Sequence, residues 1–180
     1  MLPYGNLREP PSGLKRASIV VLTHCELAGR GTVDKIKTAV KKYNPSVPVI
    51  ESSHTPDFFF SAAEQREVPV SEMNGKHAAA LSAIGDPESF ERGLTAAGMN
   101  IEQRWRYPDH HAFTEQELLS ARHAAGSLPI VTTYKDFSRF PENWRKLTGE
   151  ALYLLSINLT LTPGDTQALR NMINGLKIKK

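Results

Sequence analysis

Three consecutive polar side chains, Asp109, His110 and His111, are the residues of this sequence best suited to chemistry. They stand in the stretch "YPDHHAF", between a proline and aromatic residues. Histidine has an unperturbed pKa near neutrality, and a neighbouring carboxylate can orient an imidazole and strengthen it as a base. The triplet alone does not separate three uses, which are metal ligation, proton transfer and a structural hydrogen bond in a capped turn.

Metal ligation has a specific form, since one class of metal phosphoesterases carries the same three letters. A two-metal hydrolase also needs several carboxylates, but the upstream aspartates Asp34, Asp57 and Asp86 are isolated and form no Asp-x-Asp motif. Zinc is not indicated either, because the sequence has one cysteine and no His-x-x-x-His pair. We therefore expect no metal ligands, and a metal phosphoesterase is the less favoured alternative.

Two other stretches carry charged residues in stiff or strand-terminal positions. "LREP" contains Arg8 and Glu9, and the planar guanidinium of Arg8 could hold a phosphate. "VTTYKD" ends a strand-like run in Lys135 and Asp136. In isolation, each stretch is more often a surface ion pair or a helix cap than a site. Neither a Gly-x-x-x-x-Gly-Lys-Ser/Thr loop nor a Gly-x-Gly-x-x-Gly loop occurs.

Length and composition suit one ordinary domain, since 180 residues can bury a real core. The 22 basic and 19 acidic residues leave a formal charge of +3, too small to indicate a nucleic-acid partner. Cys25 is the only cysteine, which excludes an internal disulfide and fits a reducing compartment. No segment approaches the roughly 20 apolar residues of a membrane span. Any membrane contact is therefore expected at the protein surface or through a missing segment.

Hydrophobic patterns predict alternating strands and helices. Strands are expected over 18–23, 47–52, 67–71, 78–84, 100–107, 130–133 and 150–161. Helices are expected over 32–43, from Pro87 with Asp86 as N-cap, from a Thr114–Glu117 capping box to about Ala125, and from Pro163. The stretch 56–65 is ambiguous. Phe58–Phe60 are expected to form a core plug or a lid, and a ligand cage is the less favoured alternative. This order predicts a parallel α/β sheet, with the Asp109 triplet just after a strand, where ligands gather.

Four stretches taken in order resemble one known family. They are "LPYGNLREPPSGLKRASIVVLT", "AIGDPESFERGLTAAGM", "YPDHHAFTEQEL" and "LPIVTTYKD", and they are similar to the C-terminal half of the tetraacyldisaccharide 4′-kinases, the lipid A kinases of Gram-negative bacteria. The resemblance covers about residues 2–136. It implies a three-layer, Rossmann-like C-terminal lobe of a P-loop kinase over residues 18–180, preceded by an extended inter-lobe segment over 1–17. Ala83 and Tyr134 depart from the family pattern, which usually has glycine and glutamate there.

The resemblance also implies an activity and its partners. The family uses ATP and Mg²⁺ to phosphorylate the 4′-hydroxyl of a lipid A disaccharide precursor at the cytoplasmic face of the inner membrane. Its Walker A loop, catalytic aspartate and membrane-contacting helix belong to the N-terminal half. This chain is therefore expected to be a truncated, split or remnant kinase, or one half of a two-chain enzyme with a separately encoded N-terminal lobe, and to be inactive and soluble in the cytoplasm when alone. A non-catalytic nucleotide- or lipid-binding module, or one that complements such a lobe, is the main alternative.

Site residues follow from the same match. His110, preceded by Asp109, matches the family histidine that supports the catalytic aspartate from across the cleft. Arg8 and Glu9 match an Arg-Glu pair near the nucleotide and the junction between lobes. Lys135 and Asp136 match the Lys-Asp at the end of the last family motif. The resemblance therefore implies that His110 works with an aspartate absent from this sequence.

Overall fold

The computed structural model describes residues 7–175, which form two compact units. Unit 1 comprises the chain up to His54 and from Leu159 onward, and unit 2 comprises Thr55–Asn158. Residue 17, where the expected inter-lobe segment ends, lies within unit 1. The division between the two units falls inside two long strands, each of which contributes one end to each unit.

Within residues 7–175 the chain forms the elements of an α/β protein. The strands are β1 (Val20–Leu22), β2 (Val49–Ser61), β3 (Arg66–Pro69), β4 (His77–Ser82), β5 (Asn100–Arg106), β6 (Ile130–Thr133) and β7 (Leu152–Leu161). The helices are α1 (Arg30–Tyr43), α2 (Val70–Met73), α3 (Pro87–Ala96), α4 (Glu115–Ala125), α5 (Tyr134–Phe137), α6 (Trp144–Thr148) and α7 (Pro163–Gly175), with the 3-10 helices η1 (Pro11–Arg16) and η2 (Cys25–Leu27). The expected strands and long helices are thereby confirmed, except that Val70 and Ser71 of the strand expected over 67–71 belong to α2.

Local signals explain the helix starts. The Asp86 side chain accepts a hydrogen bond from the Ser89 N–H and caps α3, with Pro87 in the first turn. Thr114 and Glu117 form the expected capping box of α4. Residues 1–17 were expected to be extended, but within this segment Pro11–Arg16 forms the 3-10 helix η1. Proline at the first helical position presets the backbone angle φ, which accounts for this helix.

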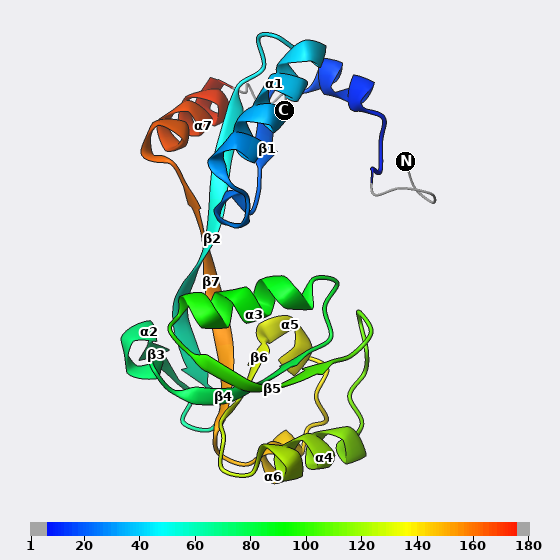
Figure 1. The fold of residues 1–180 in the computed structure, drawn as a ribbon, viewed down its shortest axis with the longest axis vertical. Helices are drawn as coiled ribbons and strands as arrows, with labels where there is room; N and C mark the ends of the chain where they lie inside the picture. Colours follow the sequence, from blue (N-terminus) through cyan, green and yellow to red (C-terminus); the bar gives the residue numbers. More distant parts are fainter. Residues whose placement is uncertain (1–6, 176–180) are drawn as a thin grey trace. The chain divides into compact units, whose positions relative to one another are not determined.

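In unit 2 the strand order is β3-β2-β7-β6-β4-β5, and β4 pairs in parallel with both β5 and β6, as β6 does with β7. Helix α3 covers one face of these strands, and α4 and α6 cover the other (Figure 1). This is the three-layer arrangement with a mostly parallel sheet that the sequence predicts.

Two cores fill the space between these layers, one on each face of β4. Ala78 and Ala80 belong to the core that contains Phe90 and Leu94 of α3. Ala79 and Leu81 belong to the core under α4 and α6. Because successive side chains of a strand alternate between faces, β4 is buried on both sides and reads as a continuous apolar run. Phe59 of β2 is fully buried in the α3 core, which confirms the core position expected for it.

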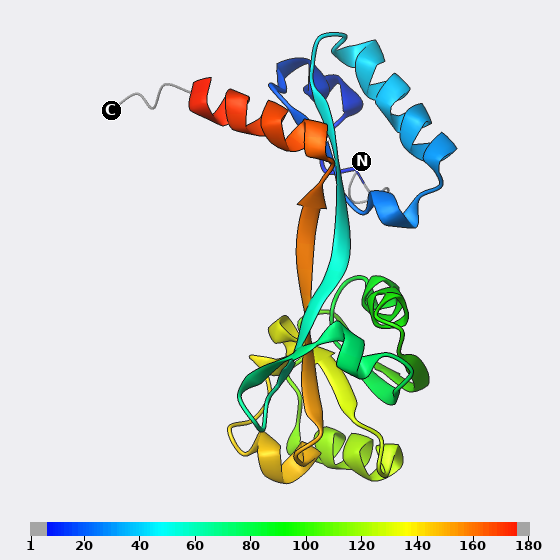
Figure 2. The same cartoon turned by 90° about the vertical axis from the view of Figure 1, so that its left-hand side faces the viewer.

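In unit 1, β1 pairs in parallel with β2, and α1 and α7 flank β2 (Figure 2). The Glu51 backbone N–H on β2 donates to Asp165 of α7 at 2.9 Å. The buried Glu51 carboxylate pairs with Lys37 and Arg30 of α1, which hold the pKa of that carboxyl below its ordinary value. Both helices are therefore joined to one residue of β2. Among the described residues, no helix is long and apolar enough to cross a membrane.

Candidate functional site at the carboxyl edge of the unit 2 sheet

The candidate site lies where three neighbouring parallel strands end. β4 ends at Ser82, β6 at Thr133 and β5 at Arg106. Because the strands are parallel, the segments that follow them emerge at the same edge of the sheet. These segments carry Gly85, Asp109, His110 and Lys135. The topology of unit 2 thus gathers residues that are up to about fifty positions apart in the sequence.

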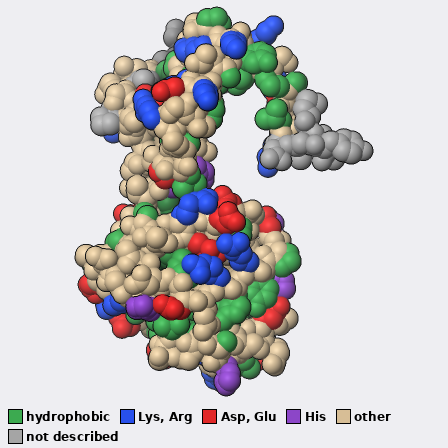
Figure 3. All heavy atoms as spheres, viewed as in Figure 1, with side chains coloured by type: hydrophobic (Ala, Val, Ile, Leu, Met, Phe, Trp, Pro, Cys, Tyr) green, Lys and Arg blue, Asp and Glu red, His purple; other side chains and the backbone are tan. Residues whose placement is uncertain are grey.

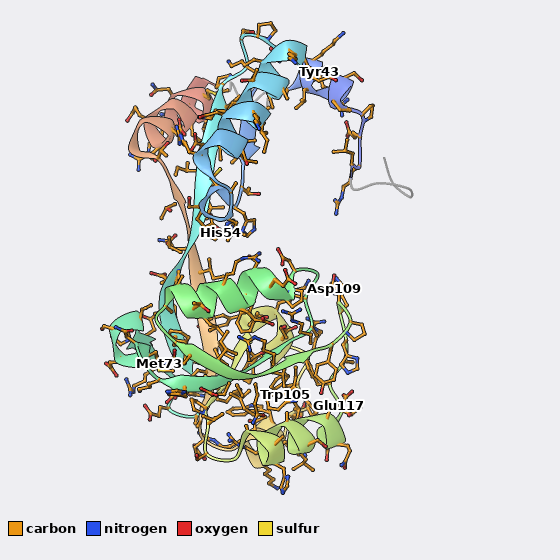
Figure 4. All side chains as sticks on the ribbon, viewed as in Figure 1. Tyr43, His54, Met73, Trp105, Asp109 and Glu117 are labelled. Carbon is orange, nitrogen blue, oxygen red and sulfur yellow. The ribbon has the colours of Figure 1, made fainter. Side chains whose placement is uncertain are left out.

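Asp109 is the centre of this site. Its Oδ2 lies 3.6 Å from His110 Nε2, and its Oδ1 lies 3.5 Å from Lys135 Nζ. The Cα of Gly85 is so close that an added Cβ would meet Asp109 Oδ2 at 3.5 Å. Figure 4 shows Asp109 beside the start of α3. One carboxylate therefore lies between an imidazole and an ammonium group, and it can orient both.

His110 is held in an unusual backbone conformation. Its φ is 63°, in the left-handed region that residues other than glycine rarely adopt. Its N–H donates to the Ala83 carbonyl at 3.2 Å, which joins the loop after β5 to the loop after β4. The side chain remains 71% exposed, and thus open to a reaction partner. Strained residues of this kind cluster at functional sites, where the surrounding structure maintains them.

His111 makes different contacts from those of His110. Its Nε2 lies 3.0 Å from both oxygens of Glu117, and its ring stacks on Tyr107 with the centroids 4.9 Å apart. Glu117 also accepts hydrogen bonds from the N–H and the hydroxyl of Thr114. Three hydrogen bonds lower the pKa of Glu117 to about 2. The largest effect comes from the backbone N–H of Thr114, and smaller ones come from His111 and the Thr114 hydroxyl. His111 therefore anchors the loop to α4 and is not part of the Asp109 cluster.

Asp136 is buried beside the site and does not line it. The Thr133 hydroxyl donates to its Oδ2 at 2.8 Å, and Arg139 donates to its Oδ1 at 2.6 Å. The Arg139 guanidinium also donates to the carbonyls of Ala83 and His111. Arg139 was not among the candidate residues. Its only sequence signal is its position three residues after Asp136, in the turn that follows α5, which is a weak indication of an ion pair.

Arg8 and Glu9 lie in unit 1, whereas Asp109, His110, Lys135 and Asp136 all lie in unit 2. Glu9 forms an exposed ion pair with Arg16. Arg8 is exposed, and over residues 7–175 no hydrogen bond or ion pair involves its side chain. The structure therefore brings three of the six candidate residues into one cluster, places Asp136 behind them, and assigns the "LREP" pair to the other unit.

The surface over α3 and β5 mixes the two signs of charge (Figure 3). The buried Glu91 of α3 receives hydrogen bonds from Arg106 at 2.7 Å and Arg104 at 3.1 Å. Arg106 contributes most to the lowering of the pKa of Glu91. These arginines are therefore largely neutralised within the fold, and Lys135 is the cation nearest Asp109 among the described ion pairs.

Comparisons with known proteins agree with this architecture. The family model for tetraacyldisaccharide-1-P 4′-kinase matches residues 1–176. A tetraacyldisaccharide 4′-kinase of Elusimicrobium minutum is 40% identical over 161 residues, covering 89% of this chain and 43% of that protein. One of Anaeromyxobacter dehalogenans is 32% identical, covering 91% of this chain and 44% of that protein. This chain thus spans less than half the length of these relatives.

A solved structure shows the same fold. The crystal structure described as an apo form of LpxK from Aquifex aeolicus in complex with ATP superposes with a TM-score of 0.58. It is 21% identical, and the match covers 97% of this chain and 47% of that one. The family model matches nearly the whole sequence, and this chain therefore belongs to the tetraacyldisaccharide-1-P 4′-kinase family.

Proposed function

We propose that this chain supplies the C-terminal part of a tetraacyldisaccharide 4′-kinase and that Asp109, His110 and Lys135 form one wall of its phosphoryl-transfer site. The observation that carries the proposal is the position of the Asp109 carboxylate, 3.6 Å from the His110 imidazole and 3.5 Å from the Lys135 ammonium at the carboxyl edge of parallel strands. The substrates would be ATP and a lipid A disaccharide precursor with a free 4′-hydroxyl.

Each residue has a role suited to its chemistry. Phosphoryl transfer depends mainly on positioning and on electrostatic stabilisation of the phosphate oxygens. The exposed Lys135 ammonium attracts those oxygens, and the exposed His110 imidazole supports the aspartate that takes the proton of the sugar hydroxyl. Asp109 orients both groups. Arg139 and Asp136 fix the loops from which these residues project.

Mg²⁺ does not fit this cluster by itself. Mg²⁺ prefers an octahedral set of oxygen ligands from carboxylates, phosphates and water. Asp109 is the only carboxylate of the cluster, and an ammonium and an imidazole flank it. No role of a residue described here depends on that ion. The sequence also contains no Walker A loop, so we assign the phosphates of ATP and Mg²⁺ to the half of the kinase that this chain does not match.

A chimera tests the proposal. The part of the Elusimicrobium minutum relative that this chain does not match would be joined to this chain, and ATP-dependent phosphorylation of the lipid precursor in detergent would be measured. We expect turnover by the chimera and none by the chain alone. His110→Ala should lower kcat by about 100-fold or more, because the aspartate that takes the proton loses the imidazole that supports it. His77→Ala is the matched control, since His77 also pairs with a carboxylate, Glu102, but stands at the start of β4.

Two outcomes would contradict the proposal. Turnover by a folded His110→Ala chimera equal to that of the parent would remove His110 from the reaction. A folded chimera that binds ATP without phosphorylating the precursor would favour a non-catalytic binding module. Circular dichroism of each protein establishes that it is folded.

A further inference from the structure

Unit 1 contains a second cluster of chemically versatile side chains, which the proposed kinase site does not use. His24, Glu26 and His54 each offer one ligand atom, and these atoms all lie within 4.8 Å of one another. His24 and Glu26 belong to the loop and 3-10 helix η2 after β1, and His54 lies on β2. Figure 4 shows His54 next to this loop. All three residues belong to the same compact unit.

Glu26 joins the two histidines. Its Oε1 lies 3.2 Å from His24 Nδ1, and its Oε2 accepts a hydrogen bond from the His54 backbone N–H at 3.0 Å. The two imidazole rings stack with their centroids 4.0 Å apart and their planes 17° apart. The carboxylate and both rings therefore face one common space.

Two observations indicate more than structural packing. His54 Nδ1 is buried, and it has no hydrogen-bond partner within residues 7–175. A buried polar atom without a partner is unfavourable and uncommon in native proteins, which indicates a missing ligand. His24 adopts φ 57° and ψ 36°, a left-handed conformation that is strained for most residues and is enriched at functional sites.

We propose that His24, Glu26 and His54 bind a divalent first-row transition metal ion, for which Zn²⁺ is the best match. Two imidazoles and a carboxylate form a common three-ligand set for Zn²⁺, with water in the fourth position. This set is a poor match for Mg²⁺, which prefers oxygen ligands. The proposed site is thus chemically distinct from the Mg²⁺-dependent kinase chemistry and does not depend on it.

The observed arrangement is close to a ligating one. Neighbouring ligands of a tetrahedral Zn²⁺ lie about 3.3 Å apart, given Zn–N distances of about 2.0 Å. The three ligand atoms, within 4.8 Å of one another, need a small adjustment. The partly exposed His24 ring can supply it by rotating out of the stack. Cys25 does not join the set, because its Sγ donates to the Leu22 carbonyl at 3.3 Å.

No metal ligands were expected from the sequence, because zinc ligands are recognised there by short, regular spacing. Here the third ligand, His54, stands 28 residues after Glu26. The parallel pairing of β1 with β2 brings it back beside the loop after β1. A bound ion would therefore link the loop after β1 to β2 and stiffen unit 1.

Metal titration of the purified 180-residue chain tests the proposal. The protein would be stripped with a chelator, dialysed, and titrated with Zn²⁺ and separately with Mg²⁺ by calorimetry. We expect about one equivalent of Zn²⁺ with a Kd of about 1 μM or lower. An excess of about 100-fold over Kd raises Tm by about 5 °C or more. Mg²⁺ at the same concentration should give neither effect.

Substitutions locate the ion. His24→Ala and His54→Ala should each weaken Zn²⁺ binding by about ten-fold or more, and Glu26→Gln, which keeps shape and an acceptor oxygen, should do the same. His77→Ala is the control, because His77 and Glu102 form an exposed pair that belongs to no three-ligand group within residues 7–175. Circular dichroism checks folding. The His24 side chain is partly exposed, so its removal should disturb folding less than removal of the His54 side chain. If His54→Ala fails to fold, His24→Ala therefore decides the result.

Three results of the Zn²⁺ titrations would overturn the proposal. They are absence of Zn²⁺ binding at about one hundred times the expected Kd, unchanged Zn²⁺ affinity in folded His24→Ala and Glu26→Gln proteins, and loss of binding in His77→Ala instead. The absorption spectrum of the Co²⁺-loaded chain is an independent readout, since Co²⁺ in a four-coordinate nitrogen and oxygen site is strongly coloured. A spectrum of hexa-aqua type would also reject the site.

Discussion

The Asp136 carboxylate and the Arg139 guanidinium meet at 2.6 Å, and the same guanidinium donates to the carbonyls of Ala83 at 3.2 Å and His111 at 3.4 Å. Arg139 therefore links the segments that follow β4, β5 and β6. Asp136 is fully buried and touches none of the exposed groups around Asp109. The two residues of the Lys-Asp pair in the fourth matched motif thus have different surroundings, since Lys135 lies beside Asp109 and Asp136 is buried against Arg139.

Asp136→Asn should destabilise unit 2 by about 2–3 kcal/mol. The substitution leaves a largely buried guanidinium without its counter-charge, and removal of one partner of a buried ion pair is strongly destabilising. The lower part of the usual range applies because the Arg139 side chain is 19% exposed. Urea unfolding followed by tryptophan fluorescence measures the effect selectively, since Trp105 and Trp144 are both in unit 2.

A second carboxylate–arginine pair provides the control. Glu150 lies 3.4 Å from Arg145 and is mostly exposed. Glu150→Gln should change the free energy of unfolding by about 0.5 kcal/mol or less, as exposed ion pairs do. Equal effects of the two substitutions would mean that the Asp136–Arg139 pair does not hold the site loops together.

His110→Gly and His110→Ala should separate the backbone from the side chain at the proposed catalytic position. Both remove the imidazole, so both should lower kcat of the kinase chimera by about 100-fold or more. Glycine adopts the observed φ of 63° without strain, whereas alanine does not. His110→Gly should therefore be more stable than His110→Ala by about 1 kcal/mol in urea unfolding. Equal stability of the two proteins would show that the left-handed conformation is not maintained.

Local patterns were enough to predict most elements of the fold. The Thr114–Glu117 capping box, the Asp86 N-cap and the β-branched run of β6 are each encoded within a few residues. The second half of β2 was ambiguous because Phe58–Phe60 is apolar on consecutive positions. Its strand conformation depends on pairing with β3, which only the folded chain provides.

The candidate site was predictable only where its residues are close together in the sequence. Asp109 and His110 are adjacent in sequence, and the family resemblance singled them out. The Arg139 contacts join residues 28 and 56 positions apart, and those of Glu26 with His54 span 28 positions. Contacts at such separations in sequence leave no periodic pattern of residues, because they arise from the parallel pairing of strands. The division into two units was missed because nothing in the sequence of β2 or β7 marks the point where one core ends.

Glu117→Gln should remove a stabilisation that depends on pH. The pKa of Glu117 is lowered to about 2 from 4.5, so its contribution is fully present above about pH 4.5 and is lost as the pH falls through about 2. At neutral pH the loss of the capping interactions should lower the free energy of unfolding by about 1 kcal/mol. This difference from the parent chain should shrink toward zero between about pH 4.5 and pH 2.

Tryptophan fluorescence during urea unfolding at several pH values gives this measurement. Glu142→Gln, which also removes an exposed acidic group of unit 2, is the control and should change stability little at any pH. A difference between the Glu117→Gln and parent chains that grows in acid would contradict the assigned role.

Lys135→Ala should reduce activity without reducing stability. Its Nζ lies 3.5 Å from Asp109 Oδ1, but both groups are about half exposed, so the pair stabilises the fold by about 1 kcal/mol at most. In the kinase chimera we expect kcat/KM to fall by about ten-fold or more, since a cation that faces the transferring phosphate is lost. Lys135→Arg, which keeps the charge, should recover part of the rate, and Lys146→Ala on α6 should leave it unchanged. If Lys135→Ala instead unfolds unit 2, the lysine has a structural role. If it retains full kcat/KM, the lysine is an incidental surface residue. In either case the proposed phosphoryl-transfer site would consist of Asp109 and His110 without Lys135.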